Sequence, residues 1–476
     1  AFYNDGTVNN NGKLTMGNLA SIGEIGLYNL SAFNNNTGGE ISIDSTSDYA
    51  LYNETGIFTN AAEITIGASS NVGNFGLYNT SNFNNNTGGD IVIDRTNSNG
   101  ILNSSATLNN SAKITIGANT NVGIYGIRNF NASLNNNTGG EISIDRSSLS
   151  GLVSISSGSI NNYAKITIGA NALVGQNGIQ NSNVFDNNTG GEIHIDNSTE
   201  TGLRNSGAFA NSGKITIGAN APVGENGLSS INSLINTTCA ELKIFKGNLI
   251  NYQTSAATGT ITNAGYILVV DTLKNDDTFT NDGILKYSVQ TGNTIINSTN
   301  SSIIVNNTPS TLFTYGGTYN GTVNGVYTDE AATVLAGTFM PPNAFVPNNT
   351  LPLGSQTLYA KVTPDGGACS YVVPFLFDNF REIDVRGNYV SIANGDMSPS
   401  VSDLTDFGVA GINFGTISNI FMIINEGTST LTLGPNPITK SGPHAADFTI
   451  LQPSETTIAP GDSVYFDITF DPSVFG

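Results

Sequence analysis

One twelve-residue segment occurs four times, with small variations, within the first 200 residues and limits the possible folds more than any other feature. FNNNTGGEISID at residues 33–44 returns as FNNNTGGDIVID at 83–94, as LNNNTGGEISID at 134–145 and as FDNNTGGEIHID at 185–196. The repeating unit is half of this interval, because an apolar residue followed two positions later by Asn recurs about every 25 residues. A repeat of this length is typical of a solenoid.

Each unit holds three short segments in which apolar and polar residues alternate. Examples are ITI at residues 64–66, GLYN at 76–79 and FNN at 83–85, separated by Gly, Asn and Thr. Alternation with a period of two over three or four residues favours strands and excludes helices. Three strands and three corners in about 25 residues make one coil, so the sequence predicts an all-β chain that begins with a parallel β-helix.

Stacked coils place equivalent residues about 4.8 Å apart, so each column of the repeat becomes a row along the axis. We expect the Ile, Leu and Phe columns to form a continuous core. An Asn amide both donates and accepts hydrogen bonds, so neighbouring amides in one row satisfy one another. The predicted Asn ladder consists of Asn35, Asn60, Asn85, Asn110, Asn136, Asn162, Asn187 and Asn211.

The residue before each ITI or ISI segment is charged, and its sign alternates over most of the repeat, as at Lys113 and Glu141. A slip by one coil would oppose like charges, so we interpret this row as a determinant of register. The exception is three consecutive acidic residues, Glu40, Glu63 and Asp90. If the repeat binds a cation, such as a structural Ca²⁺ ion, or a partner, we expect it at these three residues. The sequence indicates no other cofactor.

Aspartate ends the strand segment in every second coil, at Asp44, Asp94, Asp145 and Asp196. Parallel β-helices include polysaccharide lyases and hydrolases, whose active sites need several acidic residues clustered at a single position that differs from the rest of the repeat. Carboxylates that recur roughly 10 Å apart in identical surroundings do not form such an active site. We therefore interpret these residues as corner acids that accept turn N–H groups, and we expect no catalytic residues and no enzyme activity.

Charge and cysteine content restrict the partners. The chain has 36 Asp and Glu against 16 Lys and Arg, and its formal net charge of -20 disfavours nucleic acid and anionic membrane surfaces. No apolar segment approaches the roughly 18 residues of a membrane span, so no membrane insertion is expected. Cys239 and Cys369 are either two separate thiols or, in an oxidising compartment, one disulfide.

Segments such as GIFTNAAEITIG at residues 56–67 resemble the Asn/Gly-rich β-strand repeat regions of bacterial surface and secreted, adhesin-like proteins. The resemblance covers residues 1–310. It implies a β-helical architecture and a secreted, extracellular or cell-surface location. We assign residues 1–307 to the β-helical rod.

Two further modules are predicted beyond the repeat. Residues 308–380 are expected to cap the rod, and within them LPLGSQTLYAKVTPDGGACSYVVPFLF at 351–377 indicates two strands around a turn and resembles the end of a hyalin-repeat type immunoglobulin-like module. In residues 381–476, REIDVRGNYVSIANGD at 381–396, AADFTI at 445–450 and IAPGDSVYFDITFDPSVFG at 458–476 resemble the choice-of-anchor D module of secreted Bacteroidota proteins. This resemblance implies an immunoglobulin-like β-sandwich.

Both ends of the chain match interior parts of these patterns. AFYN at residues 1–4 matches GLYN of the repeat, and choice-of-anchor D modules continue with another strand where this chain has Gly476. We expect the chain to be a section of a longer one. A following segment or a neighbouring subunit would then complete the last module by β-strand addition.

These features predict a structural section of an extracellular bacterial appendage or fibre. It would assemble with copies of itself, or with further segments of the same longer chain, and act in attachment. A first alternative is a monomeric adhesin that binds cell-surface glycan through a row of tyrosines, Tyr28, Tyr52 and Tyr78. A second alternative is a polysaccharide lyase-like enzyme.

Overall fold

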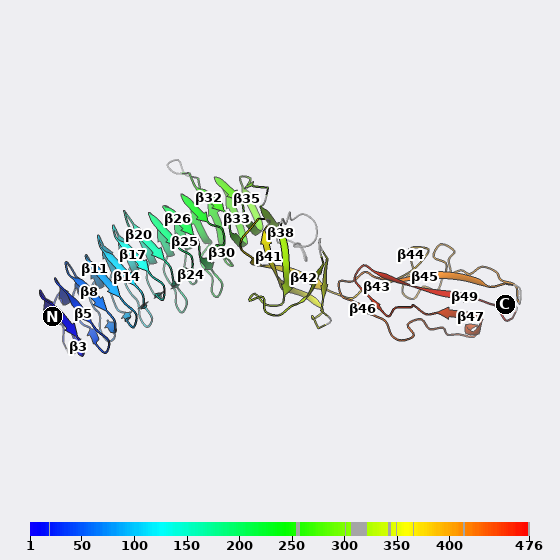
Figure 1. The fold of residues 1–476 in the computed structure, drawn as a ribbon, viewed down its shortest axis with the longest axis horizontal. Coiled ribbons are helices and arrows are strands. Elements are labelled where there is room, and N and C mark those ends of the chain that lie inside the picture. Colours follow the sequence, from blue (N-terminus) through cyan, green and yellow to red (C-terminus); the bar gives the residue numbers. More distant parts are fainter. Residues whose placement is uncertain are drawn as a thin grey trace. The chain divides into compact units, whose positions relative to one another are not determined.

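The computed structural model describes residues 1–18, 20–253, 258–299, 301–305, 321–340, 344–348, 350–364, 366–412 and 415–474. The regular secondary structure of the described chain is almost entirely β-strand, as Figure 1 shows. It divides into two compact units. The first comprises residues 1–306, 318–321 and 364–370, and the second comprises residues 307–317, 322–363 and 371–476.

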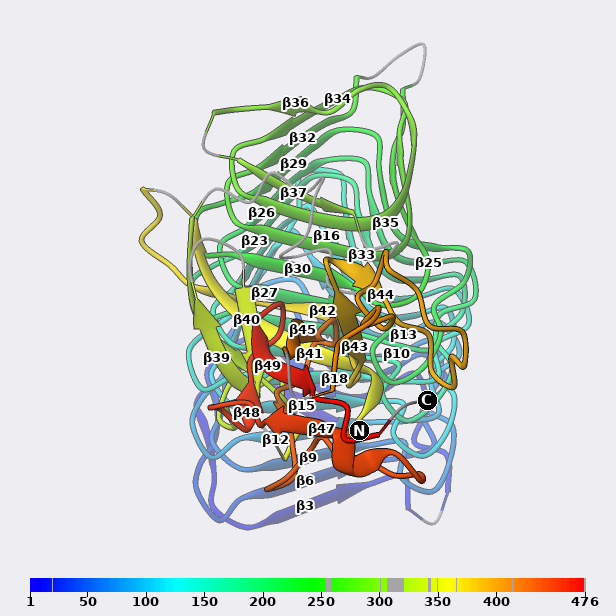
Figure 2. The same cartoon turned by 90° about the vertical axis from the view of Figure 1, so that its right-hand side faces the viewer.

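The first unit is a parallel β-solenoid of about 11 turns, and equivalent residues of most neighbouring coils are about 25 positions apart. Figure 2 shows successive coils of the solenoid one behind another. Each regular coil contributes one strand to each of three parallel ladders, which we number by their order within the coil. The prediction of a parallel β-helix with three strands per coil is confirmed.

Ladder 1 consists of β1 (Phe2–Asn4), β4 (Ile25–Asn29), β7 (Tyr49–Asn53), β10 (Phe75–Asn79), β13 (Asn99–Ser104), β16 (Tyr125–Phe130), β19 (Ser150–Ile155), β22 (Asn177–Asn181), β25 (Thr201–Asn205), β28 (Asn226–Ser230) and β31 (Asn248–Asn251). Ladder 2 consists of β2 (Val8–Asn10), β5 (Phe33–Asn35), β8 (Ile57–Asn60), β11 (Asn82–Asn85), β14 (Thr107–Asn110), β17 (Ser133–Asn136), β20 (Ser159–Asn162), β23 (Val184–Asn187), β26 (Ala208–Asn211), β29 (Ser233–Asn236), β32 (Thr260–Asn263), β34 (Thr278–Asn281) and β36 (Ile296–Asn297). Ladder 3 consists of β3 (Lys13–Met16), β6 (Glu40–Ile43), β9 (Glu63–Ile66), β12 (Asp90–Ile93), β15 (Lys113–Ile116), β18 (Glu141–Ile144), β21 (Lys165–Ile168), β24 (Glu192–Ile195), β27 (Lys214–Ile217) and β30 (Glu241–Ile244).

Period-two alternation directs side chains alternately into and out of the solenoid. In β8, Phe58 and Asn60 are buried, whereas Ile57 is exposed and Thr59 half-buried. Phe58 stacks on the phenylalanine of the preceding coil with 4.8 Å between ring centroids, which matches the strand spacing of about 4.8 Å. The core is therefore one continuous apolar column, in which each coil buries the next.

The last coils are shorter than 25 residues. Asn263 and Asn281 occupy the same row only 18 positions apart, and Asn281 and Asn297 only 16 apart. Ladders 1 and 3 fuse here, because β33 (Tyr266–Asn275) pairs with β30 through its first half and with β31 through its second. β35 (Ile284–Gly292) and β37 (Ser302–Val305) follow.

The predicted pair of strands within residues 351–377 is confirmed. β41 (Gly354–Pro364) and β42 (Tyr371–Asn379) form an antiparallel pair, and β38 (Gly321–Tyr327) completes a three-stranded sheet. The segment between β41 and β42 belongs to the solenoid unit and carries Cys369, whose Sγ forms a disulfide with Cys239. Residues 308–320, which we predicted to begin the capping module, lie outside the described residues.

The rest of the second unit is small and antiparallel, as expected for a β-sandwich. One sheet has the order β44-β43-β45-β49-β47, and a two-stranded sheet pairs β46 with β48. Phe421, Ile423, Ile458, Val464 and Phe466 form its buried core. The remaining elements are β39 (Gly337–Met340), β40 (Ala344–Pro347), β43 (Ile383–Gly387), β44 (Val390–Ser391), β45 (Ile417–Asn425), β46 (Leu431–Thr432), the short 3-10 helix η1 (Ala445–Asp447), β47 (Phe448–Leu451), β48 (Thr457–Ile458) and β49 (Ser463–Phe470).

Candidate functional site

The Asn row of ladder 2 is an unbroken chain of buried amide hydrogen bonds. Each Nδ2 donates to the Oδ1 of the next coil over 2.7 to 3.2 Å, from Asn10 to Asn297, through all eight of the predicted ladder residues. A second row at the end of the ladder 1 strands does the same from Asn4 to Asn129. In the described coils, Ser154 and Ser230 replace Asn in this second row and interrupt it. These rows hold the coils together.

The two glycines of the NNNTGG segment serve the same row. Gly139 adopts a left-handed conformation with φ of 85°, which a residue without Cβ adopts at little cost. A Cβ at the next residue, Gly140, would overlap the Oδ1 of Asn136 and lie 2.7 Å from the carbonyl oxygen of Asn110. The repeated polar segment thus shapes a corner against the amide ladder, which is a structural role.

The four aspartates that end alternate ladder 3 segments bind the loop of the following coil. Oδ1 of Asp94 accepts the backbone N–H groups of Asn119 and Thr120, both at 3.1 Å, and Oδ2 accepts the Asn119 side chain. Asp44, Asp145 and Asp196 make the corresponding bonds, and all four are almost fully buried. Their interpretation as corner acids is confirmed.

The charged row of ladder 3 stacks in the expected order. Lys13 pairs with Glu40, and Lys165 Nζ lies 3.6 Å from Glu141 Oε1. Glu40, Glu63 and Asp90 are neighbours in register, but Glu40 is engaged by the lysine and Glu63 accepts the hydroxyl of its neighbour Thr65. Among the described residues, no group of three or more His, Cys, Asp or Glu side chains is arranged to hold a metal ion.

The predicted tyrosine row lies on the outer face of ladder 1. Tyr28, Tyr52 and Tyr78 are in register, and Tyr49 and Phe75 join them. Tyr52 and Tyr78 stack with 4.7 Å between centroids, and Tyr49 stacks on both. A hydrogen bond to Glu54 raises the pKa of Tyr28 to about 12, and burial raises that of Tyr49 to about 12. The stacked rings cover part of one another's faces.

Sequence reasoning missed a shallow depression of about 550 Å³ at the corner between ladders 3 and 1. Its lining combines two guanidinium groups with amides and hydroxyls: Asn71, Arg95, Thr96, Asn97, Asn119, Thr120, Asn121 and Arg146. The signal was present in the repeat, because the residue after each corner aspartate is Ser45, Arg95, Arg146 or Asn197. A charge that appears in two of four equivalent positions marks a local departure from the repeat.

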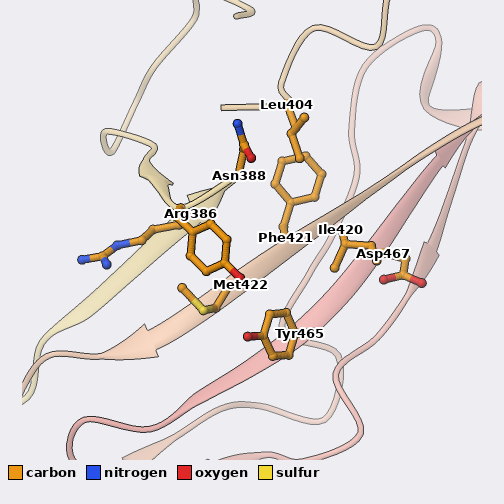
Figure 3. Close-up of a pocket in the computed structure, with 9 residues that line it drawn as sticks. Arg386, Asn388, Leu404, Ile420, Phe421, Met422, Tyr465 and Asp467 are labelled. Carbon is orange, nitrogen blue, oxygen red and sulfur yellow. The ribbon is translucent and has the colours of Figure 1, made fainter. Parts of the chain in front are cut away.

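The second unit contains a pocket of about 520 Å³, drawn in Figure 3. Met422 and Tyr465 lie opposite each other on β45 and β49, and Phe421 and Leu404 line another side. Arg386 at the rim is already paired with Asp384, at 2.6 Å, and with Glu426. The pocket therefore offers mostly aromatic and aliphatic contacts, which do not select one class of ligand.

No family model, no curated protein and no solved structure matches the chain. In the part of the chain that the structure describes, no helix has the length and apolar character needed to span a membrane.

Proposed function

We propose that the solenoid is a structural element of an extracellular appendage or surface layer, and that it associates side by side with a second copy of itself. The observation that carries this proposal is the outer face of ladder 2, which is almost free of charge although the chain carries a net charge of -20. A parallel β-solenoid fits a structural or adhesive role at a surface.

The outward positions of ladder 2 are small, polar or aliphatic. From β8 to β34 they are Ile57, Thr59, Asn82, Asn84, Thr107, Asn109, Ser133, Asn135, Ser159, Asn161, Val184, Asp186, Ala208, Ala210, Ser233, Ile235, Thr260, Thr262, Thr278 and Thr280. Only Asp186 among them is charged, and burial raises its pKa. Ile57, Val184 and Ile235 are 50%, 37% and 42% exposed.

Like-charged chains repel each other least where they meet through an uncharged surface. Ladder 3, in contrast, presents the charged row that includes Lys113 and Glu141. The ten strands from β8 to β34, spaced about 4.8 Å apart and each about 10 Å wide at this face, give roughly 480 Å² per copy and about 960 Å² for a pair. Standard stable interfaces bury about 1,200 to 2,000 Å², so the face has the size of a weak lateral contact.

Two further features support an extracellular structural role. The disulfide between Cys239 and Cys369 suits an oxidising compartment. The corner aspartates are saturated by loop N–H groups, which favours a scaffold over an enzyme. We also propose that residues 381–476 form a choice-of-anchor D module with an immunoglobulin-like fold, and that the protein comes from a member of the Bacteroidota.

Sedimentation analysis of two double variants tests the lateral contact. Thr107→Glu with Ser159→Glu places two charges on the ladder 2 face, whereas Ser143→Glu with Thr216→Glu places the same charges on ladder 3. We expect the wild type and the ladder 3 variant to dimerise at micromolar concentration and the ladder 2 variant to weaken dimerisation at least about tenfold. Equal behaviour of the two variants, or a monomeric wild type, would refute the proposal.

Glycan binding by the tyrosine row is the second candidate. A sugar ring stacks on an open aromatic face, and the faces of Tyr52 and Tyr78 are covered by neighbouring rings. This geometry favours the structural role. If the protein binds sugars on a glycan array and Tyr52→Ala abolishes this binding, glycan binding becomes the favoured function. If the protein instead releases reducing ends from an acidic polysaccharide, it is a lyase-like enzyme.

A further inference from the structure

The residue that follows each corner aspartate has a defined structural task. Arg95, Arg146 and Asn197 occupy this position with left-handed φ values of 54°, 54° and 47°. The Asn197 amide donates to the carbonyl oxygen of Gly169 in the preceding coil over 2.7 Å. A neutral amide is therefore sufficient to bind the carbonyl group at this corner.

The two arginines perform the same task with only part of their donors. Nη1 of Arg95 donates to the carbonyl oxygens of Gly67, at 2.8 Å, and Ala68. Nη1 of Arg146 likewise binds Gly117, at 2.8 Å, and Ala118. Nε and Nη2 of both residues make no hydrogen bond within the described chain. Charge and free donors are thus additional to what the corner requires.

The two guanidinium groups have no close carboxylate partner among the described residues. In the described part of the chain, neither forms an ion pair within 4.0 Å. The nearest acidic residues in sequence, Asp94 and Asp145, are 2% exposed and accept loop N–H groups instead. Two unneutralised cations at one depression contrast with a chain in which 36 acidic residues outnumber 16 basic ones.

The depression between the arginines is lined by groups that bind hydroxyls. Asn97 and Asn121 supply side-chain amides. Nδ2 of Asn119 already donates to Asp94. The Oγ1 of Thr120 is shielded from solvent, so Thr120 contributes to the wall of the depression and does not bind the ligand.

The two guanidinium groups stand at equivalent places two coils apart, a repeat of roughly 9.6 Å along the axis. A guanidinium fork binds carboxylate or sulfate oxygens in a bidentate manner. One anionic group on every second sugar of an extended polysaccharide repeats over a similar length. Nucleic acid carries a phosphate on every nucleotide, so the net negative charge of the chain repels it more strongly than a polysaccharide with one anionic group per two sugars.

We infer that this depression binds an acidic polysaccharide that lies along the solenoid axis, with Arg95 and Arg146 receiving anionic groups of alternate sugars. The side-chain amides of Asn97 and Asn121 between them bind the sugar hydroxyls. The site is independent of the ladder 2 face and does not require self-association.

Calorimetric titration of the full chain at about 50 mM salt tests this site, because low ionic strength preserves the charge contribution. The probes are an oligouronate, a sulfated oligogalactan, neutral dextran and a single-stranded oligonucleotide. Arg95→Asn with Arg146→Asn supplies at each corner the amide that Asn197 already provides, so the fold is retained. Arg204→Asn with Arg381→Asn removes the same charge at positions outside the depression.

We expect the wild type and the control variant to bind the oligouronate or the sulfated oligogalactan with similar affinity. The Arg95 and Arg146 double variant should lose at least about tenfold, with an unchanged melting temperature. Whichever acidic probe binds identifies the anion as a carboxylate or a sulfate. The inference is wrong if neither acidic probe binds, if dextran or the oligonucleotide binds equally well, or if the control variant loses as much affinity.

Discussion

Asparagine has two opposite uses in this protein, and adjacent residues show them. Asn136 is buried, accepts the Asn110 amide at 2.8 Å and donates to Asn162 at 2.7 Å. Asn135 faces outward and forms a parallel amide row, donating to Asn109 at 2.8 Å. Water can replace the partners of the outer amide but not those of the inner one, so only the inner row is expected to contribute strongly to stability.

Replacing Asn136 by Ala should therefore destabilise the solenoid far more than replacing Asn135 by Ala. The first change removes two buried amide–amide hydrogen bonds and leaves Asn110 and Asn162 only long bonds of 3.4 Å to the backbone, which costs about 2 to 3 kcal/mol, whereas the second should cost less than about 1 kcal/mol. Urea unfolding followed by circular dichroism measures both. Equal losses for these two neighbouring variants would show that burial of the amide row is not what stabilises it.

At this scale the sequence predicted the rows but not their departures from regularity. Asn35 to Asn211 could be aligned because the repeat brings identical residues to one column. Arg95 and Arg146 were missed because they differ from the residues of their own column, and only the structure shows that an amide suffices for the same carbonyl contact.

Strands were predictable as elements because each contains a full alternation of apolar and polar residues. The regular coils place a corner loop between ladder 3 and the next ladder 1 strand. In β33 that loop is missing, so one strand of ten residues serves both ladders. The sequence showed shortening from about Leu268 onward, but the fusion of two ladders depends on pairing with the previous coil, which no single segment encodes.

The fused region contains an unusual buried cation. Lys286 in β35 is 1% exposed, and burial lowers its pKa from 10.5 to about 8. Between pH 8 and 10.5 the unfolded chain binds the proton that the folded chain has lost, so the free energy of unfolding should rise with pH in this interval. The contribution is on the order of 1 to 3 kcal/mol.

Comparison with Lys286→Met isolates this contribution from other groups that titrate at high pH. The free energy of unfolding of Lys286→Met minus that of the wild type should fall as pH rises from 7.5 to about 10.5, because only the wild type gains stability from the loss of this proton. The exposed Lys113→Met serves as the control and should show no such change. Denaturant titrations at several pH values measure both, and a difference for Lys286→Met that does not vary with pH would contradict the assignment.

At the scale of the whole molecule, the distribution of charge separates the surfaces by use. The row of alternating charges lies on ladder 3, the outward positions from β8 to β34 on ladder 2 include Asp186 as their one charged residue, and Arg95 and Arg146 line one depression of an acidic chain. The sequence predicted the solenoid and a small antiparallel region after it. The sequence alone did not reveal the uncharged face, because that face becomes visible only when the outward residues of successive coils are placed side by side.

Electron microscopy of the wild-type protein at micromolar concentration shows whether solenoids associate laterally. We expect pairs of solenoids apposed along their length through ladder 2. We also expect that Thr107→Glu with Ser159→Glu separates them, whereas Ser143→Glu with Thr216→Glu does not. Solenoids that remain single at every concentration, or that associate through the charged ladder 3 face, would contradict the proposed lateral association.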